Sequence, residues 1–112
     1  MRVASAPRSV GAMPEQQARE YVAECYWPGV QDSDLRALDE RAAASVAALS
    51  RDGDAVRYLG SLLMREDEVV LCRFAGPHEV VQRAAQQAAI PFERILEAAT
   101  SPWIDERPSG EE

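Results

Sequence analysis

The feature that most constrains this chain is the order in which strand-like and helix-like patterns of apolar residues follow one another. Four runs are rich in strand formers, and two stretches repeat apolar residues at helical spacing. Turn residues separate these segments, among them Gly53, the Gly76-Pro77 pair and Pro91. In chain order, the pattern predicts a strand at 21–26, a helix of about 18 residues with Asp32-Ser33 as its N-cap, strands at 55–64 and 68–74, a helix at 78–89 and a strand at 92–98.

This order predicts an α+β fold of the ferredoxin-like βαββαβ type. Right-handed crossovers and pairing between neighbours place both helices on one face of an antiparallel sheet, with the third strand central and beside the first. The third strand is largely apolar on both faces, with Val70, Cys72 and Phe74 on one and Val69 and Leu71 on the other. Because two helices cover only one face, we expect the other to be buried against a second copy, which predicts a homodimer through sheet faces or edges.

Length and composition limit the chain to one domain. It has 112 residues, of which 46% are hydrophobic, enough for one core. We divide it into a flexible N-terminal arm at 1–18, a ferredoxin-like domain at 19–100 and an acidic C-terminal tail at 101–112. No apolar run is long enough to span a membrane, and residues 1–14 lack the apolar stretch of a secretory signal. Two cysteines in such a chain indicate free thiols, so we expect a cytoplasmic protein without a membrane partner.

The charge balance argues against nucleic acid as a partner. The net charge is −7, and all twelve basic residues are arginines scattered among carboxylates. Such a chain repels phosphate backbones. The third strand also lacks the stacked aromatic residues of RNA-binding versions of this fold.

Glu24 is the first candidate functional residue. It lies in the middle of a strand expected to be central, where a carboxylate must be paired or must face a cleft. With Tyr26, Tyr58 and Arg57 as candidate neighbours, it could form an acid–base pocket in which Glu24, Tyr26 and Tyr58 are catalytic. The alternative is a structural ion pair.

His78 and the two cysteines are the other candidates. His78, the one histidine of the chain, lies at the start of the second helix, either as an exposed residue or as a metal ligand. Cys25 and Cys72 fall on neighbouring antiparallel strands, where we expect them to be offset and therefore not joined in a disulfide. Neither belongs to a Cys-x-x-Cys motif, so buried small side chains are the expected state of both.

Several strings of the chain resemble a family of small bacterial proteins, common in actinobacteria, described as nickel-binding-protein-like and formerly as a domain of unknown function. They read ECYWPGV at 24–30, VRYLGS at 56–61, LCRF at 71–74 and IPFERI at 90–95. The resemblance extends over about 21–100 and implies a ferredoxin-like fold, a dimer and surface-bound nickel with a sequestration role. Some members carry a histidine in the second helix where this chain has residues 83–86, which leaves His78 as the imidazole for a metal.

Three functions follow as hypotheses. The first is a small, dimeric, nickel-binding-like protein with a metal-binding or accessory role. The second is a cofactor-free dimeric enzyme, an oxygenase, isomerase or cyclase, that acts on a small organic molecule through Glu24, Tyr26 and Tyr58. The third is a protein-interaction module in which Trp103 and Ile104 anchor the tail onto the body or onto a larger partner.

Overall fold

The structure is a computed structural model and describes residues 19–99. The arm predicted at 1–18 and the tail predicted at 101–112 lie outside the described residues. The elements follow the predicted order, which confirms the ferredoxin-like α+β fold. They are β2 (Glu20–Tyr26), α1 (Asp32–Arg51), β3 (Arg57–Met64), β4 (Val69–Ala75), α2 (His78–Gln87) and β5 (Arg94–Ala98).

The start of α1 differs from the prediction. Gln31, rather than Asp32-Ser33, is the N-cap, and Asp32 is already helical. The Gln31 backbone N–H donates to the Asp34 carboxylate at 2.9 Å, while the Asp34 N–H donates to the Gln31 carbonyl oxygen at 2.9 Å. This reciprocal pair satisfies backbone groups that a helix start leaves open, so the helix begins one residue earlier.

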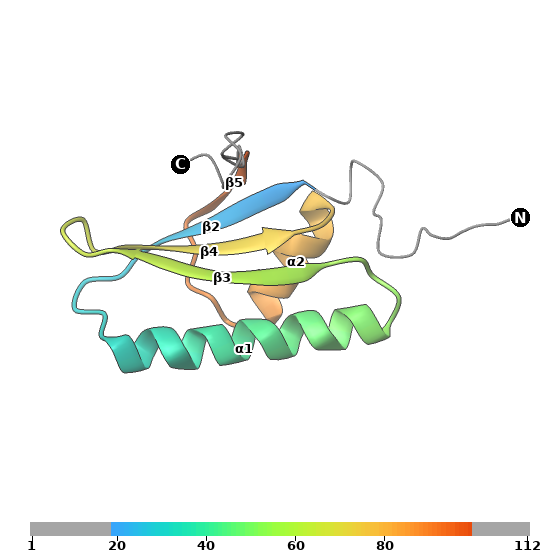
Figure 1. The fold of residues 1–112 in the computed structure, drawn as a ribbon, viewed down its shortest axis with the longest axis horizontal. Coiled ribbons are helices and arrows are strands. Elements are labelled where there is room, and N and C mark those ends of the chain that lie inside the picture. Colours follow the sequence, from blue (N-terminus) through green and yellow to red (C-terminus); the bar gives the residue numbers. More distant parts are fainter. Residues whose placement is uncertain (1–18, 100–112) are drawn as a thin grey trace, which may run out of the picture.

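The four strands form one antiparallel sheet in the order β3-β4-β2-β5. The third strand of the chain, β4, is therefore central and lies beside the first, β2, as predicted. Both helices lie on the same side of this sheet (Figure 1). No helix within residues 19–99 is long and apolar enough to cross a membrane.

The core lies between the helices and the face of the sheet that they cover. On this face the central strands contribute fully buried side chains, and each helix turns an apolar stripe toward them. Ser45 of α1 donates its hydroxyl to the Ala84 carbonyl oxygen of α2 at 2.8 Å, which joins the two helices. The largest fully buried side chains are Leu38, Phe74, Val70, Val81, Cys25 and Cys72.

Candidate functional site

Glu24 forms an ion pair on the face of the sheet that faces away from the helices, here called the open face. Glu24 lies directly opposite Arg94 of β5 in the register of the sheet. The Arg94 Nε donates to the Glu24 Oε1 at 2.5 Å, and this hydrogen bond raises the pKa of the arginine. The ion-pair partner of Glu24 is therefore Arg94 and not Arg57, the arginine that the sequence analysis named as a candidate neighbour. The sequence offered no signal for Arg94, because pairing between β2 and β5 depends on a register that composition does not fix.

The three residues of the predicted acid–base pocket are not brought together. Tyr26 shares the open face with Glu24 and is 57% exposed. Tyr58 lies opposite Phe74 on the helix-covered face, and its hydroxyl donates to the Asp39 Oδ1 of α1 at 2.6 Å. Burial, and then the hydrogen bond to Asp39, raise the pKa of Tyr58. The sheet therefore separates Tyr58 from the other two.

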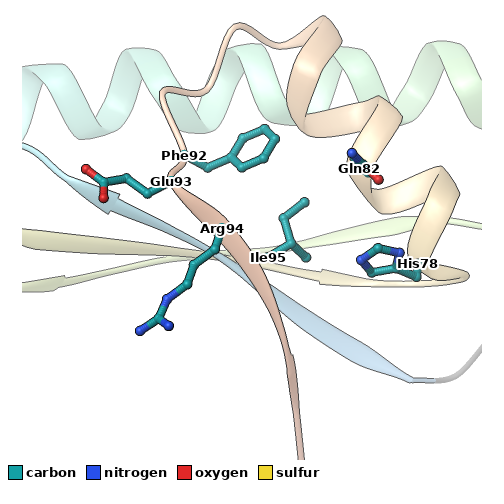
Figure 2. A pocket seen from close by; sticks show the side chains of 6 residues that line it. All are labelled: His78, Gln82, Phe92, Glu93, Arg94 and Ile95. Atoms are coloured by element: carbon teal, nitrogen blue, oxygen red, sulfur yellow. The ribbon is translucent and has the colours of Figure 1, made fainter.

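His78 stands at the edge of a shallow cleft between α2 and β5 (Figure 2). Its ring packs edge-on against Tyr21, with 5.2 Å between the ring centroids. His78 and Gln82 project from neighbouring turns of α2 toward Phe92 and Ile95, whereas Arg94 extends away from them (Figure 2). The cleft has a volume of about 240 Å³. Its complete lining is His78, Gln82, Phe92, Glu93, Arg94 and Ile95.

Cys25 and Cys72 are free, fully buried and offset on neighbouring strands, which confirms the prediction. Cys72 lies opposite Ala23, two residues from Cys25, so the thiols are diagonal neighbours. A hydrogen bond with Cys25, and then burial, raise the pKa of Cys72. A buried thiol that stays protonated is a poor nucleophile, because the thiolate is the reactive form.

The donors of the described residues do not fit a closed nickel site. Within residues 19–99, no three His, Cys, Asp or Glu side chains lie together in a way that could hold a metal ion. His78 packs against an aromatic ring, and both thiols are in the core. A single imidazole on an exposed helix start gives at most weak metal binding.

The most distinctive surface of the described residues is apolar and lies on the open face. The large hydrophobic side chains that are most exposed are Tyr26, Leu62 and Met64, at 57, 50 and 43%. Met64 and Tyr26 both lie opposite Val69, and Leu62 lies opposite Leu71. These five residues therefore form one continuous surface, here called the open-face patch.

Comparison with known proteins supports the fold. Neither a protein-family model nor a curated protein matches the chain. Among solved structures, the chain is similar to SCO4226 from Streptomyces coelicolor A3(2), with a TM-score of 0.55 and 20% sequence identity. The match covers 74% of this chain and 99% of that chain. The likeness shows the fold alone.

Proposed function

We propose that this protein is a small cytoplasmic accessory protein that works as a homodimer, in which two copies join through the open faces of their sheets. The observation that carries the proposal is the open-face patch. In this patch three large hydrophobic side chains are 43–57% exposed on a sheet face that neither helix covers. An antiparallel sheet with an uncovered apolar face gains most by burying it against a matching surface.

The charges of the open face favour a second copy as the occupant. Glu20 lies 3.9 Å from Arg73, and Glu24 pairs with Arg94, so both acids on this face have arginine partners. Arg57 lies on this face as well, opposite Ala75, so the face holds two acids and three arginines, a net charge of about +1, although the whole chain carries −7. Two copies repel each other least when they meet through this face. A two-fold arrangement also lets the same patch serve both partners.

A charge placed in the patch tests the proposal. We expect Leu62→Arg to weaken the dimer at least tenfold, because the arginine must be desolvated at the interface. Sedimentation equilibrium on the full chain measures this dissociation. Ala47→Arg is the matched control, because Ala47 is exposed on α1, away from the sheet. A monomeric wild-type protein, or a dimer that Leu62→Arg does not weaken, contradicts the proposal.

Nickel binding remains a prediction of the family resemblance, and His78 is the residue that tests it. Because the described residues offer no set of three donors, we expect any nickel binding to be weak and to depend on this imidazole. Titration calorimetry of the tag-free protein should show a small binding heat that His78→Ala removes. Tight binding that His78→Ala leaves unchanged would place the donors elsewhere in the chain.

A further inference from the structure

We propose that the cleft between α2 and β5 is the docking site for the segment that follows β5 in the same chain, with the Trp103 side chain as its anchor. The cleft is lined by His78 and Gln82 of α2, by the half-buried Phe92 and Ile95, which pack against the core, and by the exposed Glu93 and Arg94. It lies between the helix layer and the edge strand (Figure 2). The open-face patch is on the other face of the sheet, so this docking leaves the proposed dimer interface free.

The size of the cleft favours a single large side chain over a small-molecule ligand. Its volume of about 240 Å³ is below the range of about 300–1,000 Å³ that is typical of ligand pockets. An indole is flat and largely apolar, with one N–H donor, and it buries about 150–250 Å² when it is enclosed. Such a ring is suited to a cleft with apolar side chains at its base and polar groups at its rim. The Gln82 side chain offers a carbonyl oxygen for the indole N–H.

The segment that follows β5 is long enough for Trp103 to turn back from the end of the strand to this cleft. Ala98, the last residue of β5, lies opposite Glu20, and Glu20 lies opposite Ala75 on its other side. Ala98 therefore lies about two strand spacings, roughly 10 Å, from Ala75, and about 10 Å along β5 from Ile95, which lines the cleft. Trp103 is five residues beyond Ala98 and can reach about 17 Å.

The sequence of the segment supports the same occupant. Between residues 100 and 112, the only large apolar side chains are the adjacent Trp103 and Ile104. Asp105 and Glu106 follow at once, and Pro102 comes directly before. One apolar anchor beside charged residues is the pattern of a short docking sequence, because the anchor is desolvated while the charges stay in water.

Tryptophan fluorescence tests the proposal directly. The full chain with Trp27→Phe keeps Trp103 as its one tryptophan. We expect its emission to be blue-shifted, and its quenching by acrylamide several-fold weaker, than in the same protein unfolded in urea. Gln82→Arg in this background should shift the emission to the red by crowding the cleft with a long charged side chain. Gln86→Arg, an exposed position one turn further along α2 and outside the cleft lining, is the matched control.

The emission of Trp103 in these variants either supports the docking or overturns it. A blue shift that Gln82→Arg removes and Gln86→Arg keeps supports the proposal. Trp103 emission equal to that of the unfolded chain overturns it, and so does a blue shift that Gln82→Arg leaves unchanged. Dilution distinguishes the occupants, because docking within one chain persists when the dimer dissociates. A blue shift that is lost together with the dimer would place Trp103 against the second copy and would overturn docking within one chain. Circular dichroism confirms that every variant is folded.

Discussion

The hydrogen bond from Tyr58 to Asp39 is a single contact that joins the sheet to α1. Its O···O distance of 2.6 Å is short, and the acceptor is a carboxylate, so we expect a stronger bond than between neutral groups. Tyr58→Phe removes the donor and leaves the half-buried Asp39 without it, which should lower the free energy of unfolding by about 1–2 kcal/mol. Urea denaturation at neutral pH measures this loss. Tyr26→Phe, at an exposed position, should change stability by less than about 0.5 kcal/mol.

The same residue predicts an alkaline limit to stability. The pKa of Tyr58 is raised in the folded protein, so the folded state holds its proton more tightly than the unfolded state does. The resulting contribution is complete below the ordinary tyrosine pKa of about 10 and is lost as pH rises above it. Stability should therefore fall less steeply in Tyr58→Phe than in wild type above about pH 10. Parallel curves for the two proteins would contradict the assignment.

Among the elements, β3 has the least regular geometry, because a bulge interrupts its pairing with β4. The register shifts between Tyr58 and Gly60, and Gly60 has a φ of +108°. Without the shift, strict alternation would place Leu62 on the same face as Tyr58, toward the helices. The bulge instead places Ser61 and Leu63 on the helix-covered face and turns Leu62 to the open face. A single glycine thus decides which side chains form the open-face patch.

Substitutions at two glycines, Gly60 and Gly76, distinguish the cost of backbone strain from the cost of steric overlap. Both have positive φ, but a Cβ at Gly60 meets nothing within 4 Å, whereas one at Gly76 would lie 2.7 Å from the Ala55 carbonyl oxygen. We expect Gly60→Ala to cost about 1–2 kcal/mol from strain alone. Gly76→Ala should cost about 2–5 kcal/mol, because overpacking adds to the strain. Urea denaturation ranks the two, and equal costs would contradict the predicted overlap.

The sequence predicted the order of the elements because their lengths, periodicities and turn residues are local properties. The central position of β4 and the offset of Cys25 and Cys72 followed from chain direction and handedness. The bulge at Gly60 had one local signal, a glycine inside a strand pattern, whose effect on the two faces depends on pairing. The Glu24–Arg94 pair had none, since these residues are 70 apart and meet only through register. Tyr58 was wrongly predicted beside Glu24 for a related reason, because the face on which a strand residue lies also depends on register.

At the scale of the whole molecule, the net charge of −7 opposes association of two copies, while the nearly neutral open face and its apolar patch favour it. Long-range repulsion is screened by salt, over a Debye length that falls from about 30 Å at 0.01 M to about 10 Å at 0.1 M. Burial of apolar surface does not weaken over this range.

The proposed dimer should therefore tighten as salt is added. We expect the dissociation constant to fall several-fold between about 0.01 and 0.3 M NaCl, as measured by sedimentation equilibrium. Glu40→Lys, at an exposed position on α1, removes two units of negative charge without touching the sheet and should reduce this dependence. A dimer that weakens with salt would instead be held by ion pairs between the copies. Arg73 and Arg94 would then exchange their partners within the chain for the acids of the second copy.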